Sequence, residues 1–188
     1  MSSLTVLIIR HGEKPDKGWP GPGTTPDGNS DPKSLVIRGW QRAGTWSVLF
    51  GSELSNPDYP KPNIIYAANP NGENPDTSQR PLQTVTPLAE KLGLDPVKNR
   101  AVGQEEDLVA DVLAQSGVVL IAWEHKAIAP GILRLLAKGQ ELPNMPTKWK
   151  GTRFDVVLRL DRSSSDSQWS SRQLFPCLLS GDSAAPMP

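Results

Sequence analysis

The stretch "LTVLIIRHGEKP", residues 4–15, decides how this chain can fold. Its first six residues, 4–9, form a nearly continuous apolar and β-branched run, which is typical of a strand covered on both faces of a sheet. Arg10, His11 and Gly12 follow without any spacer. A buried strand that ends in this way directs a guanidinium and an imidazole toward one place, which is therefore the first candidate for a functional site.

Two further apolar runs, at 62–69 and 118–125, predict buried strands of the same kind. Helical patterns occupy the intervals around the strands, at 34–51, 77–93, 104–117 and 127–138. The segments 154–162 and 173–181 predict two late strands that pair antiparallel across a serine-rich link. Strands that alternate with helices favour an α/β fold, here a three-layer α/β/α sandwich with a mostly parallel central sheet.

Pro87 stands inside the helical pattern 77–93. The pattern allows either one helix kinked at Pro87 or a second helix that Thr86 caps and Gly93 closes. Long loops, which we expect to set the specificity of any site, are predicted at 14–34, 69–79 and 139–153.

The composition bounds the class of protein. A length of 188 residues fits one domain, 1–188. Twenty basic and twenty acidic residues cancel, so net charge gives no case for nucleic acid or an anionic membrane as partner.

The single cysteine, Cys177, cannot form an internal disulfide. The opening apolar run is too short for a signal peptide, and no run approaches the ~20 residues of a membrane helix. We expect a soluble, cytoplasmic protein.

The chain contains two histidines, and each of them follows an apolar run. His11 comes after 4–9, and His125 comes after 118–123. Parallel sheets bind ligands outside the carboxyl ends of their strands. A single histidine is more often structural than catalytic, but two histidines at two strand ends favour a site at this edge.

Two arginines accompany the histidines. Arg10 adjoins His11, and Arg80 starts a helical pattern after the loop that leaves 62–69. A guanidinium offers a planar fork of donors that suits phosphate, and a helix N-terminus adds oriented N–H groups. A neutral imidazole can attack phosphorus and carry the phosphoryl group, while arginines stabilise the transition-state charge. A zinc site is the weaker interpretation because a third clear ligand is missing, and no metal or cofactor is expected.

These segments resemble the histidine phosphatase superfamily, which has the phosphoglycerate mutase-like fold. "RHGEK" (10–14) looks like the RHG signature, and "SLVIRGWQRA" (34–43) is similar to the helix that follows it. The family's strand, loop and arginine–threonine segment resembles "IIYAAN" and "SQRPLQT" within 64–84. The strand with the second histidine resembles "VVLIAWEH" (118–125). The resemblance covers roughly residues 4–135, with motif order and spacing that fit.

The resemblance implies a role for each matching position. His11 would be the phosphorylated nucleophile, and Arg10 and Arg80 would bind the phosphoryl group. His125 would be the second histidine of the phosphate pocket. Two features depart from the family pattern: the second histidine lies in "EHK" instead of "SHG" or "HD", and the loop before Arg80 is longer.

The general acid is not obvious from the motifs. The family often places it some 25 residues past the second arginine, which lands on "GQEED" and makes Glu105 the first choice and Glu106 the second. Glu124 and Glu13 remain candidates. Acidic residues in a first helical turn are also ordinary stabilisers of the helix dipole, so the structural interpretation of Glu105 stays open.

The resemblance implies a phosphatase that hydrolyses a phosphomonoester, or another phosphorylated substrate, through a phosphohistidine on His11. One alternative is an inactive family member that binds a phosphorylated ligand or a protein partner. A second is phosphoryl transfer of the phosphoglycerate mutase type, which the short chain disfavours because it leaves little room for large insertions. We expect a small phosphorylated substrate, and the oligomeric state stays open.

Overall fold

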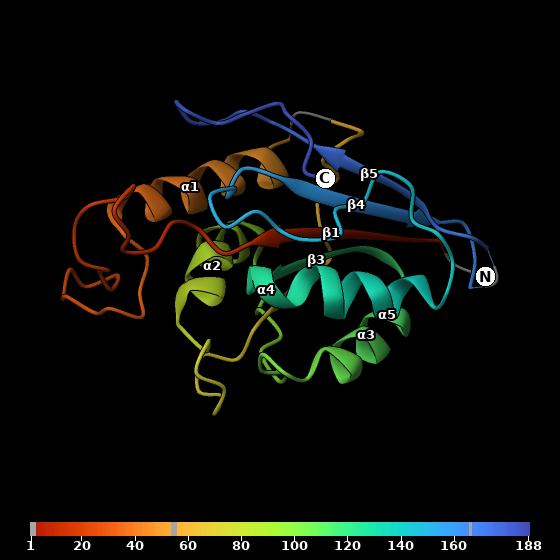
Figure 1. The fold of residues 1–188 in the computed structure, drawn as a ribbon, viewed down its shortest axis with the longest axis horizontal. Helices are drawn as coiled ribbons and strands as arrows, with labels where there is room; N and C mark the ends of the chain where they lie inside the picture. Colours follow the sequence, from red (N-terminus) through yellow and green to blue (C-terminus); the bar gives the residue numbers. More distant parts are fainter. Residues whose placement is uncertain (1–2, 54–55, 166) are drawn as a thin grey trace.

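The computed structural model describes residues 3–53, 56–165 and 167–188. Their strands form a sheet in the order β2-β3-β1-β4-β5 (Figure 1). Its members are β1 (Leu4–Arg10), β2 (Ile64–Ala67), β3 (Gly117–Trp123), β4 (Val157–Arg162) and β5 (Ser170–Leu174). β2, β3 and β1 run parallel, whereas β4 runs antiparallel to β1. The mostly parallel sheet expected from the sequence is therefore confirmed.

The late antiparallel pair is also confirmed, because β5 pairs antiparallel with β4. The expected extent of its second strand, 173–181, is wrong, since β5 begins at Ser170 and ends at Leu174. Pro176 cannot donate to a ladder, and Cys177 has a φ of 48°, outside the extended region. The two residues end the strand early.

Helices fill the intervals between the strands. They are α1 (Ile37–Gly51), α2 (Arg80–Leu92), α3 (Glu105–Leu113), α4 (His125–Ala127), the π-helical η1 (Ile128–Leu133) and α5 (Arg134–Ala137). α2 is one helix across Pro87, because the Thr86 hydroxyl donates to the Leu82 carbonyl one turn back instead of capping a new helix. Gly93 closes α2 with a φ of 65°.

Alternate side chains of β1 point to opposite faces of the sheet, and each face carries its own core. Leu7 and Ile9 pack in a cluster with side chains of α1 and α2. Val6 and Ile8 pack in a second cluster with side chains of α3, η1 and α5. This is the predicted three-layer sandwich, with the sheet between two helical layers (Figure 1). In the described part of the chain, no helix has the length and apolarity needed to cross a membrane.

The strand register places the two histidine segments side by side. Arg10 of β1 is opposite Trp123 of β3, and the His11 amide donates to the Trp123 carbonyl at 3.2 Å. His11 and Glu124 therefore leave neighbouring strands at the same level, with His125 one residue further on. This is the carboxyl edge of the parallel part of the sheet, where α/β proteins bind ligands.

Candidate active site

His11 is held in one tautomer. Its Nδ1 lies 2.7 Å from the Gly12 carbonyl oxygen, and because a carbonyl can only accept, Nδ1 carries the hydrogen and Nε2 keeps its lone pair. The side chain is buried. Burial, with the positive charge of Arg10 as the next cause, lowers the pKa of His11 well below its usual value. The result is a neutral imidazole with a free electron pair, the form required of a nucleophile.

Gly12 and Thr84 fix the turn that carries His11. The Gly12 amide donates to the Thr84 hydroxyl at 2.7 Å, and that hydroxyl donates to the Arg80 carbonyl at 2.7 Å. A Cβ at Gly12 would lie 2.9 Å from the Gly39 carbonyl oxygen, closer than real contacts allow. Glycine is therefore required here, and the threonine four residues after Arg80 ties the first turn of α2 to the turn after His11.

Arg10 is buried beneath an aromatic ring. Its guanidinium lies 3.8 Å from the ring centre of Phe154, and Nη1 donates to the Gly151 carbonyl at 2.6 Å. Burial lowers the pKa of Arg10 to about 9, so the group still carries its charge at neutral pH. Its Nε is buried without a hydrogen-bond partner among the described residues. A buried cation with an unused donor is suited to an anionic ligand.

Arg80 approaches the same place from α2. Its Nε donates to the Ser34 carbonyl at 3.3 Å and its Nη2 to the Pro32 carbonyl at 2.7 Å. In the described part of the chain, Nη1 makes no hydrogen bond and stays free for a ligand. The charge of Arg80 contributes to the lowered pKa values of both His11 and Arg10, as its proximity to them requires.

His125 and Glu124 form a pair opposite His11. The two imidazole rings are 6.4 Å apart between centres and nearly perpendicular. Glu124 Oε1 lies 2.6 Å from His125 Nδ1, and its Oε2 accepts the Lys126 amide at 2.6 Å, which caps α4. Burial opposes ionisation of Glu124, but the contacts with His125 and the Lys126 amide outweigh it, and the pKa of Glu124 is lowered.

The structure adds a third donor to the two histidines considered for a metal. One ligand atom each from His11, Glu124 and His125 lies within 4.8 Å of the others. Both Glu124 oxygens are already engaged, by His125 and by the Lys126 amide. Arg10 and Arg80 add two positive charges close by. The charge and bonding of these residues therefore suit an anion better than a metal cation.

The candidate acids lie in different surroundings. Glu105 Oε1 accepts the Trp123 indole N–H and the Gly103 amide, each at 2.9 Å. Glu106 is exposed, and Glu13 is fully buried in an ion pair with Arg42. Among the described residues, Glu124 is the carboxylate grouped with both histidines. The spacing in the sequence favours Glu105, but the indole of Trp123, the last residue of β3, binds its carboxylate.

Phe154 and Gly151 form one wall of the site; Gly151 lies in the loop 139–153 that the sequence predicts to set specificity, whereas Phe154 lies outside every segment predicted to form the site. Phe154 lies with its ring centre 6.1 Å from that of His11, and the Gly151 carbonyl holds Arg10. Both precede β4, beyond the segment 4–135 that carries the family motifs. A lone Phe or Gly in a loop has no periodic signal, so only long-range packing reveals its place.

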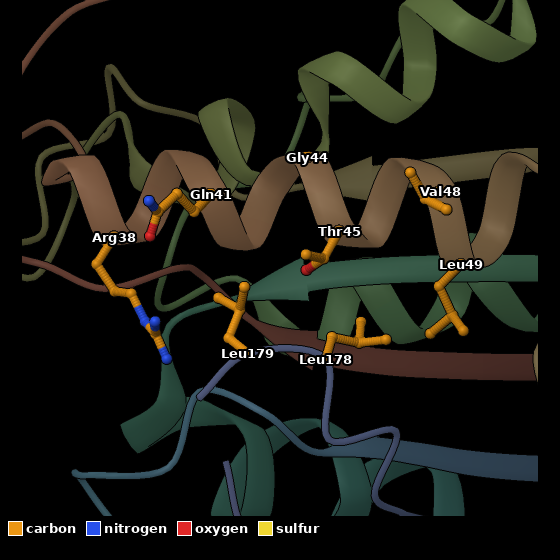
Figure 2. A pocket seen from close by; sticks show the side chains of 8 residues that line it. All are labelled: Arg38, Gln41, Gly44, Thr45, Val48, Leu49, Leu178 and Leu179. Carbon is orange, nitrogen blue, oxygen red and sulfur yellow. The ribbon is translucent and has the colours of Figure 1, made fainter. Parts of the chain in front are cut away.

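A separate groove of about 640 Å³ runs along α1. Figure 2 shows Leu178 and Leu179 of the C-terminal segment beside α1, with Thr45 and Leu49 facing them. None of the candidate site residues lines this groove, so it is separate from the group of residues at the carboxyl edge of the sheet.

The sheet order and the two helical layers form a phosphoglycerate mutase-like fold. The chain is similar in structure to a mycobacterial glucosyl-3-phosphoglycerate phosphatase (TM-score 0.52, 14% identity), over 92% of this chain and 98% of that one. It is also similar to the protein histidine phosphatase SixA in complex with tungstate (TM-score 0.55, 15% identity), over 92% and 97%. No protein-family model and no curated protein matches the sequence.

Proposed function

We propose that this protein is a phosphatase that hydrolyses a phosphomonoester through a phosphohistidine on His11. The observation that carries the proposal is the state of His11. Its Nδ1–H is held by the Gly12 carbonyl, its imidazole is neutral, and Arg10, Arg80 and His125 surround it. The likeness in fold to two phosphatase structures, one of them a protein histidine phosphatase, supports the same chemistry.

The reaction proceeds in two displacements. In the first, His11 Nε2 forms a bond to phosphorus while the bond from phosphorus to the leaving oxygen breaks. Arg10 and Arg80 bind the non-bridging oxygens and stabilise the charge that spreads over them. In the second, water attacks phosphorus, the P–N bond breaks, and inorganic phosphate and free His11 result.

Rapid quenching of the wild type during turnover of p-nitrophenyl phosphate tests this proposal. We expect mass spectrometry to find a phosphoryl group on His11 that is lost in acid and kept in base. A protein that binds vanadate but neither turns over substrate nor forms this adduct would be the inactive binder instead.

The leaving oxygen needs a proton when it belongs to an alkyl group. We assign the delivery of that proton to His125, whose Nδ1 lies 2.6 Å from Glu124 Oε1, because a carboxylate at this nitrogen orients an imidazole for proton transfer. Glu124 is then a positioning residue that acts through His125. This assignment replaces Glu105, whose carboxylate is occupied by Trp123 and Gly103.

For Glu124→Gln we expect hydrolysis of an alkyl phosphate to slow by about 10²-fold, the typical size of general-acid catalysis. Turnover of p-nitrophenyl phosphate, whose leaving group departs unprotonated, should change little. The glutamine can still accept the Lys126 amide, so the cap of α4 stays. Glu105→Gln is the matched comparison: if it alone shows this dependence on the leaving group, the sequence-based assignment holds.

For Arg80→Ala we expect inhibition by vanadate or phosphate to weaken tenfold or more, about 1.4 kcal/mol or above, because a charge-assisted contact to the anion is lost. Arg172→Ala removes an exposed arginine of β5 and should leave the inhibition constants unchanged. Equal constants for Arg80→Ala and the wild type would place Arg80 outside the site.

A further inference from the structure

A cavity of about 570 Å³ opens beside His125. Its walls include Pro130 of η1 and the segment that holds Lys148, Trp149 and Gly151. A Cβ placed on Gly151 would lie 3.9 Å from His125 Nε2, so this nitrogen is at the cavity wall. The volume is in the range of small-molecule sites and far exceeds one phosphoryl group, so it leaves room for a leaving group.

The cavity is joined to the phosphate site through Gly151 as well as through His125. The Gly151 carbonyl accepts Arg10 Nη1 at 2.6 Å, while the same residue lines the cavity. The Trp149 side chain is buried and its indole N–H donates to the Arg153 carbonyl at 2.8 Å. A wall fixed in this way, in a lining that also contains Pro130, is suited to hold a small organic group by packing.

The mouth of the site carries more positive charge than one phosphoryl group needs. Lys126 and Lys148 line the cavity, and its lining contains no carboxylate. Lys148 is exposed, and no carboxylate among the described residues pairs with it. Lys126 does have a partner, Asp76 at 2.8 Å. Burial and the charges of Arg80, Arg10 and Lys126 together lower the pKa of Lys14 at the same edge.

We propose that the cavity beside His125 binds the leaving group of the substrate, and that this group carries a second anion, a carboxylate or a phosphate, which Lys148 and Lys126 bind. The proposal rests on the phosphatase function, because the first phosphoryl group is placed at His11. It narrows the substrate to small phosphorylated compounds with a second negative charge. A dianionic phosphoryl group alone would leave Lys148 without an anionic partner, whereas Lys126 already pairs with Asp76.

Calorimetry with phosphonates, which are not hydrolysed, tests the proposal without any need for turnover. The probes are benzylphosphonate, 3-carboxybenzylphosphonate and the bisphosphonate with a second phosphonomethyl group on the ring. We expect the two doubly charged probes to bind the wild type at least tenfold more tightly than benzylphosphonate. The stronger of the two tells whether the second anion is a carboxylate or a phosphate.

Lys148→Met should reduce this preference to threefold or less, and Lys148→Glu should abolish it, with the affinity for benzylphosphonate nearly unchanged. Lys61→Met, at an exposed lysine before β2 that pairs with Glu53, is the control and should keep the wild-type preference. Equal affinity of the wild type for all three probes would overturn the proposal. Turnover of p-nitrophenyl phosphate is measured separately, so an active enzyme without the preference refutes this inference alone, and failure of the phosphohistidine assay refutes the function alone.

Discussion

Replacing His11 with asparagine should lower the turnover of p-nitrophenyl phosphate by at least about 10⁴-fold, the size of effect seen when an enzyme loses its nucleophile. The change removes Nε2, which forms the bond to phosphorus in the proposed mechanism. It keeps a donor in the place of Nδ1–H, because the asparagine amide can reach the Gly12 carbonyl that His11 binds at 2.7 Å. The loss of turnover is therefore caused by the missing Nε2 and not by a disturbed turn after β1.

The turnover rate of His11→Asn is accompanied by measurements of its phosphoenzyme, its melting temperature and its binding of phosphate. The phosphoenzyme should be absent from His11→Asn, while the melting temperature and the binding of inorganic phosphate stay near those of the wild type, because Arg10 and Arg80 remain. His125→Asn is the matched comparison: it should slow turnover yet still form the phosphoenzyme. Activity of His11→Asn within tenfold of the wild type would contradict the mechanism.

The position of the site could be predicted from the sequence because local patterns determine it. A buried parallel strand is a continuous apolar run, and the residue after it lies at the carboxyl edge. Two such runs end at Arg10 and Trp123, and the structure pairs these residues. Sequence order and the geometry of parallel strands thus bring His11 and His125 to one edge without any knowledge of packing.

The surroundings of the site could not be predicted, because side chains far apart in the chain decide them. Glu105 had the expected spacing, but the Trp123 indole binds its carboxylate across 18 residues. Phe154 reaches Arg10 from 144 residues away. No local pattern encodes such contacts, since they depend on how the segment before β4 crosses the end of the sheet. The end of β5 was misplaced for a local reason: Pro176 and Cys177, which has a positive φ, follow the strand.

A buried ion-pair network ties the C-terminal segment to the turn after His11. Arg42 donates to Glu13 Oε1 at 2.8 Å and to both oxygens of Asp182 at 2.7 Å. The three side chains are at most 4% exposed. Glu13 follows "RHG" directly, so α1 and the segment near 182 both fix the loop of the nucleophile. Arg38 lies farther off, 3.8 Å from Glu13 and 4.0 Å from Asp182.

Arg42→Met should reduce the free energy of unfolding by about 3 kcal/mol or more, because removing one partner of a buried pair leaves uncompensated buried charges. Urea unfolding at pH 7 measures this loss. Arg100→Met breaks a more exposed pair with Asp111 and should change stability little. A loss below about 1 kcal/mol for Arg42→Met would mean that Arg38 replaces it.

The loss of unfolding free energy in Arg42→Met should also depend on pH, and the pKa of Asp182 gives the direction. Burial opposes ionisation of Asp182, but its hydrogen bonds to Arg42 and the Leu179 amide outweigh this, so the pKa of Asp182 is lowered. Its pairing therefore stabilises the wild type fully above the unfolded pKa of about 3.9, and this contribution is lost as the pH falls through the lower, folded pKa. In Arg42→Met the Arg42 hydrogen bond, the largest of the contacts that lower this pKa, is absent, and protonation of Asp182 relieves the buried charge. The difference in unfolding free energy between the two proteins should consequently be larger at pH 7 than at pH 3.5, and a difference that stays constant would show that Arg42 acts by packing on Trp46 instead of by charge.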